Sequence, residues 1–290
     1  MTILLTCGDP NGIGLEVCIK ALMRLFEPSA PKRFDAEVRL IAAPDTFWEY
    51  VRNLQLPLER TASGFVLYGR EYRIIPCASK HHLEFGVENR SGGSLALEAL
   101  EIAARELREG RADAVCTMPV SKHALYLAGA TFPGQTEFFA ERFGVEKPLM
   151  ILATEAAELD PKRSAVRVGL ATVHIPLQNV AQAITQERVL ERITAMNHSL
   201  KQDFGLLKPK IAVLGVNPHA GEQGALGKEE EEIIEPAIKS AQNQGIAVFG
   251  AFPADGFFAH GEFRNFDGII AMYHDQGLIP LKLLAGGGGV

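Results

Sequence analysis

The sequence predicts an α/β fold with a largely parallel sheet, from its composition and from two alternating patterns along the chain. Of the 290 residues, 47% are hydrophobic and 22% are charged, which is typical of a globular protein with a sizeable core. Strands of a parallel sheet are covered on both faces, so they read as continuous Val-, Ile- and Leu-rich runs without polar alternation. Because such runs alternate here with helical stretches, we expect helices packed against the sheet.

Eight short apolar runs are expected to form the strands. They are residues 3–8, 38–43, 114–120, 149–154, 166–174, 211–217, 246–252 and 268–274. Helices are predicted at 15–26, 94–109, 187–201 and 228–243. The run of glutamates that opens the last of these complements the positive end of the helix dipole, which favours a solvated helix start. A strand-like segment at 278–284 precedes the glycine-rich end AGGGGV, and we expect a complete enzyme of this fold to continue beyond it.

The first predicted strand runs into the first helix through the loop GDPNGIG, residues 8–14. Its spacing, G-x-x-x-G-x-G, matches neither the dinucleotide pattern G-x-G-x-x-G nor the P-loop, and no lysine follows Gly14. Glycine permits positive φ angles and close approach of another group, and the following helix N-terminus can attract an anion. We favour a structural turn beside a site over a phosphate cradle, and keep Gly8, Gly12 and Gly14 as second-rank cofactor-binding candidates.

Charge and cysteine usage exclude several classes of protein. The formal net charge of −6 argues against a nucleic-acid-binding surface, which would be clustered and basic. The four cysteines are scattered without a C-x-x-C pair, which indicates reduced thiols. No apolar run reaches membrane length, and the N-terminus lacks the basic region of a signal peptide. We therefore expect a soluble cytoplasmic protein without nucleic-acid or membrane partners.

Three of the eight histidines share one context, because His174, His219 and His274 each follow or close a predicted parallel strand. Open α/β sheets bind their ligands at the carboxyl ends of the strands, and imidazole is a common ligand of divalent metals. The alternative is that each histidine forms hydrogen bonds within its own turn; the shared context favours a common metal. The other histidines are expected to be surface or structural residues: His81, His82, His123, His198 and His260.

Six strings, in this order, resemble the 4-hydroxythreonine-4-phosphate dehydrogenase family. They are GDPNGIGLEV, PGQTEFF, ATVHIPL, GVNPHAGEQGALGKEE, FPADGFF and MYHDQGLIPLK. The resemblance extends from residue 3 to the end of the chain, and the NPHAGE and MYHDQG blocks are its most specific parts.

The resemblance implies a homodimeric oxidoreductase of pyridoxal 5′-phosphate biosynthesis that uses NAD or NADP and one divalent metal per subunit (Zn, Mg or Co). Its substrate would be a phosphorylated hydroxy-amino acid, 4-(phosphooxy)-threonine. The resemblance also implies two α/β/α domains, as in isocitrate and isopropylmalate dehydrogenases, with the active site in a cleft between them. On that basis residues 1–125 with 250–290 would form the nucleotide domain, lacking its C-terminal part, and 126–249 the domain of dimerisation and metal ligands.

The resemblance assigns roles to individual positions of this chain. His174, His219 and His274 match the metal ligands; Gln135, Thr136 and Lys282 match substrate contacts; and Lys282 and Asp255 match catalytic positions. Two positions depart from the family pattern. Gln135 stands where the family has His, and Gly256 where it usually has Thr. Because a glutamine amide donates hydrogen bonds but carries no titrating proton, we favour a positioning role for Gln135.

Two questions remain open from the sequence. Lys122 is either a second anion contact or a helix-surface lysine. The chain is the dehydrogenase described above, a sister enzyme that acts on a 4-phospho sugar acid such as erythronate or threonate 4-phosphate, or a homologue that binds metal or phosphate without catalysis. The metal, the preference for NAD or NADP and the subunit that donates each ligand are not predicted.

Overall fold

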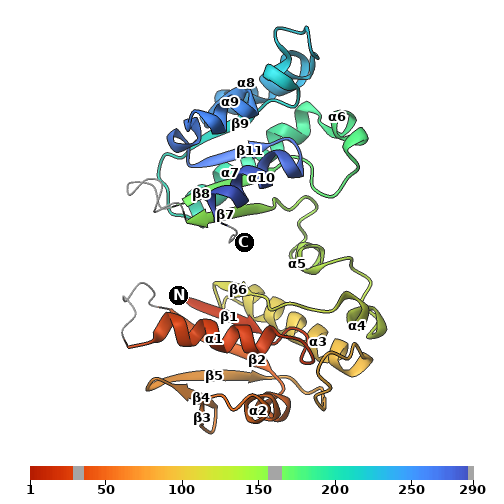
Figure 1. The fold of residues 1–290 in the computed structure, drawn as a ribbon, viewed down its shortest axis with the longest axis vertical. Coiled ribbons are helices and arrows are strands. Elements are labelled where there is room, and N and C mark those ends of the chain that lie inside the picture. Colours follow the sequence, from red (N-terminus) through yellow and green to blue (C-terminus); the bar gives the residue numbers. More distant parts are fainter. Residues whose placement is uncertain (29–35, 156–164, 287–290) are drawn as a thin grey trace. The chain divides into compact units, whose positions relative to one another are not determined.

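The computed structural model describes residues 1–28, 36–155 and 165–286 of the chain (Figure 1). The chain divides into two compact units, Met1–Pro148 and Leu149–Val290, and each contains one sheet with its helices.

Unit 1 is built on a six-stranded sheet in the order β3-β4-β5-β2-β1-β6. Its parallel part comprises β1 (Thr2–Thr6), β2 (Glu37–Ala42), β5 (Arg70–Pro76) and β6 (Ala114–Cys116). The antiparallel edge consists of β3 (Glu59–Arg60) and β4 (Gly64–Leu67). Leu4, Leu40 and Ile41 in the central strands are at most 2% exposed, which explains their uninterrupted apolar sequences.

In the described part of unit 1, five α-helices accompany this sheet. They are α1 (Gly14–Phe26), α2 (Pro44–Asn53), α3 (Arg90–Arg108), α4 (Lys122–Leu127) and α5 (Gln135–Phe143). Helix α3 begins at an asparagine cap, because the Asn89 side chain accepts a hydrogen bond from the Gly92 amide at 2.8 Å. Stacked rings of Phe47, Phe65 and Tyr72 join α2 to the antiparallel edge.

Unit 2 is built on a five-stranded sheet in the order β10-β9-β11-β8-β7. Four strands are parallel: β8 (Ala165–Leu170), β9 (Lys210–Leu214), β10 (Ala247–Phe252) and β11 (Gly268–Ala271). The edge strand β7 (Ile151–Glu155) pairs with β8 in the antiparallel direction. The carboxyl ends of the four parallel strands therefore lie along one edge of the sheet.

Helices bury both faces of the second sheet. They are α6 (Val180–Ala183), α7 (Gln186–Gln202), α8 (Glu235–Asn243), α9 (Ala254–Ala259) and α10 (His274–Leu284). Along β9, Ile211 and Val213 join one apolar cluster, while Ala212 and Leu214 join the other. This alternation follows from the opposite directions of successive side chains in a strand. A π-helical turn, Glu230–Ile234, leads into α8.

All eight predicted strands are confirmed, with shifted ends, but the segment 278–284 is helix α10 and not a strand. Leu278 and Leu281 are buried and three positions apart, whereas Ile279 and Leu283 are exposed, a helical pattern that Pro280 does not interrupt. The predicted domain boundaries are also wrong. Residues 250–286 belong to unit 2, because β10 and β11 pair with β9 and β8, and residues 126–148 belong to unit 1.

Candidate functional site

Four of the residues with predicted roles follow the four parallel strands of unit 2. In sheet order, Asp255 follows β10, His219 follows β9, His274 follows β11 and His174 follows β8. A parallel sheet binds its ligands at this edge, because the loops and helix N-termini after the strands converge there. The three histidines follow parallel strands, as the sequence predicts, and the topology shows that these strands are adjacent.

His174 and His274 lie close together. Their ring centroids are 5.9 Å apart with the ring planes inclined by 42°. Both rings line a cavity of about 360 Å³, whose wall also includes Tyr273, Asp275 and apolar side chains such as Val180. The His274 side chain is 38% exposed, so its ring is open to a ligand in this cavity.

The carboxylate of Asp275 orients the His274 ring. Asp275 Oδ1 lies 2.7 Å from His274 Nδ1. Because an ionised carboxylate only accepts hydrogen bonds, Nδ1 of His274 carries the proton, and Nε2 of the neutral ring keeps its lone pair. A histidine oriented in this way by a carboxylate is typical of metal centres, and the donor set of the cavity suits a divalent cation.

His219 differs from the other two histidines. It lies in the short turn Pro218–Gly221, where its φ of 53° and that of Ala220, 49°, are in the left-handed region. Within the described residues, no three His, Cys, Asp or Glu side chains come close enough to hold a metal ion. The structure therefore brings together two of the three predicted ligands and places the third on the adjacent strand end, where its role stays a prediction.

Hydrogen bonds connect the segments that follow strands β8, β9 and β11, close in sequence to these histidines. Thr172 Oγ1, after β8, donates to the Met272 carbonyl after β11 at 2.7 Å. Gln276 in α10 accepts from the Met272 amide at 2.7 Å and donates to the Gly215 carbonyl after β9 at 2.6 Å. The only signal of these residues in the sequence is a polar side chain just beyond an apolar strand, which is too common to select them.

Lys282 and Asp255 are not brought to the histidine pair. Lys282 is exposed in the last turn of α10, about 12 Å along the helix axis from His274 at a rise of 1.5 Å per residue. Asp255 is exposed in the first turn of α9. Neither residue lines the 360 Å³ cavity.

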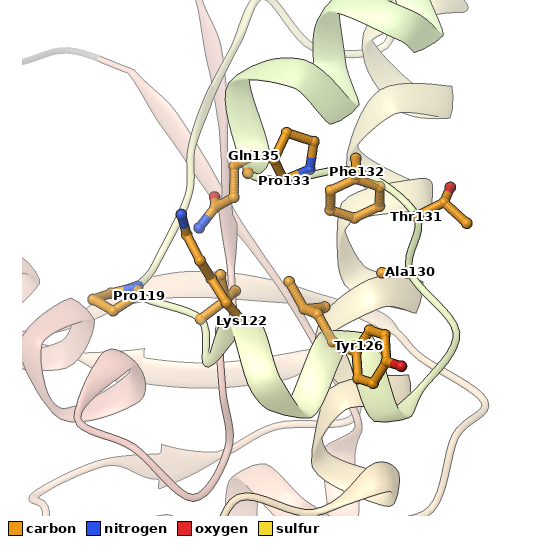
Figure 2. A pocket seen from close by; sticks show the side chains of 11 residues that line it. Pro119, Lys122, Tyr126, Ala130, Thr131, Phe132, Pro133 and Gln135 are labelled. Carbon is orange, nitrogen blue, oxygen red and sulfur yellow. The ribbon is translucent and has the colours of Figure 1, made fainter. Parts of the chain in front are cut away.

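Gln135 and Thr136 begin helix α5 in unit 1. Gln135 lines a cavity of about 630 Å³ together with Lys122, Tyr126 and Phe132, whose side chains Figure 2 shows around it. Its Nε2 donates to the Met118 carbonyl at 3.3 Å, and its buried Oε1 has no hydrogen-bond partner in the described part of the chain. The cavity brings Lys122 and Gln135 together, whereas the exposed Thr136 does not line it.

Two of the three loop glycines are needed for packing. Gly8 has a φ of +66°, and a Cβ there would lie 2.4 Å from the Pro119 carbonyl oxygen. A Cβ on Gly14 would lie 2.9 Å from the Cys7 carbonyl oxygen, whereas one on Gly12 would meet nothing closer than 3.4 Å. This close packing supports the structural turn; the second-rank role in cofactor binding stays a prediction.

The same loop is held by a buried polar network. The Asn11 side chain donates to the Val87 carbonyl at 2.8 Å, and its Oδ1 lies 2.8 Å from His81 Nε2. His81 Nδ1 lies 2.8 Å from Ser91 Oγ at the start of α3. Burial lowers the pKa of His81 and outweighs the opposite effect of Asp9. His81, predicted to be a surface or structural residue, is buried and structural.

The fold is that of an α/β protein with two sheets, in which three histidines follow the carboxyl ends of adjacent parallel strands, the edge where such sheets commonly bind ligands. Residues 30–290 match the family model described as pyridoxal phosphate biosynthetic protein PdxA. The chain belongs to this family, which confirms the family membership predicted from its motifs.

Relatives and solved structures agree with this assignment. The chain is 38% identical over 290 residues to the 4-hydroxythreonine-4-phosphate dehydrogenase of Bacteroides thetaiotaomicron, covering 99% of this chain and 76% of the relative. The crystal structure of the same-named enzyme from Klebsiella pneumoniae superposes with a TM-score of 0.82 at 32% identity, covering 98% and 84% of the two chains. The family makes this chain an oxidoreductase, as predicted.

A structure with a different name also matches. It is a terephthalate 1,2-cis-dihydrodiol dehydrogenase from Burkholderia xenovorans LB400, with a TM-score of 0.67 and 28% identity, covering 100% of this chain and 84% of that one. The fold therefore occurs in dehydrogenases named for different substrates. Among the described helices, each is too short or too polar to cross a bilayer.

Proposed function

We propose that the chain oxidises the secondary alcohol of 4-(phosphooxy)-threonine with NAD or NADP, in pyridoxal 5′-phosphate biosynthesis. The carbinol C–H bond would break with hydride transfer to the nicotinamide, and the hydroxyl proton would pass to a base. The product, 2-amino-3-oxo-4-(phosphooxy)butanoate, would then lose its carboxylate as carbon dioxide and give 3-amino-2-oxopropyl phosphate. The observation that carries the proposal is the His174–His274 pair at the sheet edge, in a family whose relatives have this named activity.

The proposed metal ligands are His174, His219 and His274, which would hold one divalent ion (Zn, Mg or Co). When bound, such an ion polarises the substrate hydroxyl and the ketone oxygen that replaces it, a stabilisation of several kcal/mol. Asp275 supports this role, because its bond to Nδ1 of His274 leaves Nε2 available. Apolar side chains, including Val180, form part of the wall of the same cavity.

Further roles are proposed for residues outside the histidine pair. Lys282 supplies a cation for the phosphate or carboxylate, or relays a proton, and Asp255 is a second candidate for that proton. Gln135 and Thr136 contact the substrate, with Gln135 positioning it through an amide that cannot titrate. The homodimer, the cytoplasmic location, the active-site cleft and the likeness to isocitrate dehydrogenase stay predictions.

A second candidate function is oxidation of a 4-phospho sugar acid, such as erythronate or threonate 4-phosphate. Two observations favour keeping it: Gln135 replaces the family's histidine, and a structural relative is named for another substrate. The two substrates differ by an amino group in place of a hydroxyl, so turnover of each by the same preparation separates the two candidates. A third candidate function is binding of metal or phosphate without catalysis.

The test is reduction of NAD or NADP by the purified chain with a divalent metal and each substrate in turn. We expect turnover with 4-(phosphooxy)-threonine, loss of turnover in His174→Ala, and unchanged turnover in His198→Ala, an exposed histidine on α7. Turnover of the sugar acid alone would favour the second candidate. If a folded preparation binds metal but reduces no cofactor with either substrate, the enzymatic proposal is wrong.

A further inference from the structure

Glu230 is a buried carboxylate that none of the roles above uses. It is only 1% exposed, although it opens the π-helical turn that leads into α8. Buried carboxylates require hydrogen-bond partners, because desolvation of the charge is otherwise costly. Among the described residues, the hydrogen-bond partners of Glu230 are in the loop that carries His219.

The contacts of Glu230 converge on the start of this loop. Oε1 accepts hydrogen bonds from the amides of Val216 at 2.7 Å and Asn217 at 2.8 Å. Oε2 accepts from the Asn217 side-chain amide at 2.9 Å, and the same Asn217 nitrogen also donates to Glu229 at 2.7 Å. One carboxylate thus binds two successive backbone amides and a side chain immediately before Pro218 and His219.

The loop that follows is strained. His219, Ala220, Glu222 and Gln223 all have positive φ angles, between 44° and 54°. Non-glycine residues adopt this conformation only where the surroundings impose it, at a cost on the order of 1 kcal/mol or more per residue. A Cβ on Gly221 would lie 2.7 Å from Glu230 Oε2, so the carboxylate fills the inside of this turn.

The same loop is connected to the helix that carries His274. Gly215, one residue before the Glu230-bound amides, accepts a hydrogen bond from Gln276 Nε2 at 2.6 Å. A Cβ on Gly215 would lie 3.0 Å from Glu230 Oε1, so this position is packed against the carboxylate as well. Glu230 and Gln276 therefore both bind backbone groups just after β9, Glu230 immediately before His219 and Gln276 from the helix that begins at His274.

We propose that Glu230 is a positioning residue, whose buried carboxylate holds the strained His219 loop at the sheet edge beside His274. The expected consequence for metal binding rests on the proposed function, whereas the effect on the loop itself does not. Residues that orient metal ligands through hydrogen bonds typically change metal affinity by about 10- to 100-fold when replaced.

The test compares Glu230→Ala and Glu230→Gln with the matched control Glu231→Gln, which removes one charge from an exposed neighbour. Glutamine keeps an acceptor for the two backbone amides but sets a donor against the Asn217 side chain, so its effect should be smaller. The first measurement is amide hydrogen exchange at Val216, Asn217 and His219 in the metal-free chain. The second is affinity for Zn²⁺ or Co²⁺ by competition with a chelator.

We expect faster exchange at these three amides in Glu230→Ala, a smaller increase in Glu230→Gln, and none in Glu231→Gln. Metal affinity should fall by about 10- to 100-fold in Glu230→Ala and remain unchanged in the control. Unchanged exchange in folded Glu230→Gln and Glu230→Ala overturns the positioning role, as does faster exchange with unchanged metal affinity. If the wild-type chain binds no divalent metal, the proposed metal centre fails, and the exchange result alone decides the role of Glu230.

Discussion

Replacing the loop glycines one at a time separates a packing role from cofactor binding. In Gly8→Ala, the left-handed conformation costs about 1–2 kcal/mol, and overlap with the Pro119 carbonyl adds about 1–3 kcal/mol. In Gly14→Ala, the overlap with the Cys7 carbonyl costs a similar 1–3 kcal/mol, less up to about 1 kcal/mol for the better helix propensity of alanine. Gly12→Ala is the matched control, because its Cβ has room, and we expect a change within about 0.5 kcal/mol.

The assay is urea unfolding followed by tryptophan fluorescence. The chain has one tryptophan, Trp48, which is 8% exposed in α2 of unit 1. This helix contacts the loop directly, since Tyr50 Oη donates to the Gly12 carbonyl at 2.9 Å. With a denaturant slope of about 2 kcal/mol per molar, a loss of about 2 kcal/mol lowers the midpoint by about 1 M.

The packing account is refuted if Gly8→Ala and Gly14→Ala unfold at the wild-type urea concentration. A tenfold rise in the Michaelis constant for NAD in a Gly12→Ala variant of wild-type stability would also contradict the packing role. That result would make the loop a cofactor site in its own right, despite its unusual glycine spacing.

Three further predictions concern single side chains. Asp275→Asn should lower metal affinity by about tenfold, because the amide orients the His274 tautomer less strongly; equal affinity in a chelator competition would contradict this. Burial depresses the pKa of His81 in the folded chain. Below about pH 6.5 the unfolded chain therefore binds a proton at His81 more readily than the folded chain does, so the free energy of unfolding of unit 1 should fall as the pH is lowered. His81→Gln should lack that part of the pH dependence in urea titrations, and a profile identical to wild type would show that His81 does not cause it. Gln135→His should add an inflection near pH 6.5 to the pH profile of kcat/KM, because imidazole titrates there and an amide does not; an unchanged profile would place this position away from the substrate.

The strands were predictable because most are buried on both faces and read as uninterrupted apolar runs. The parallel strand β5 is not predictable in this way, since it includes charged Arg70, Glu71 and Arg73 and carries no such run. The antiparallel edge strands β3 and β4, of two and four residues, are too short to give one. The sequence of helix α10 predicts a strand because Pro280 and the neighbouring leucines obscure its helical period. The predicted division, with residues 250–290 in the first domain, rests on a resemblance alone. The pairing of β10 and β11 with strands of the second sheet, which only the structure shows, places this segment in unit 2.

For the site, position after a parallel strand was enough to select His174 and His274, which the structure brings together. Glu230 and Gln276 could not be selected in the same way. They act through hydrogen bonds to the backbone of a distant loop, which depend on tertiary structure and leave no spacing pattern in the sequence.

Anomalous scattering from crystals of the chain grown with Zn²⁺ or Co²⁺ tests the proposed metal centre most directly. We predict one strong anomalous peak bonded to a ring nitrogen of each of His174, His219 and His274, with Nε2 as the ligand atom of His274. Asp275 should remain hydrogen-bonded to the other nitrogen of that ring. No peak at these histidines, or a peak coordinated without His219, would contradict the account.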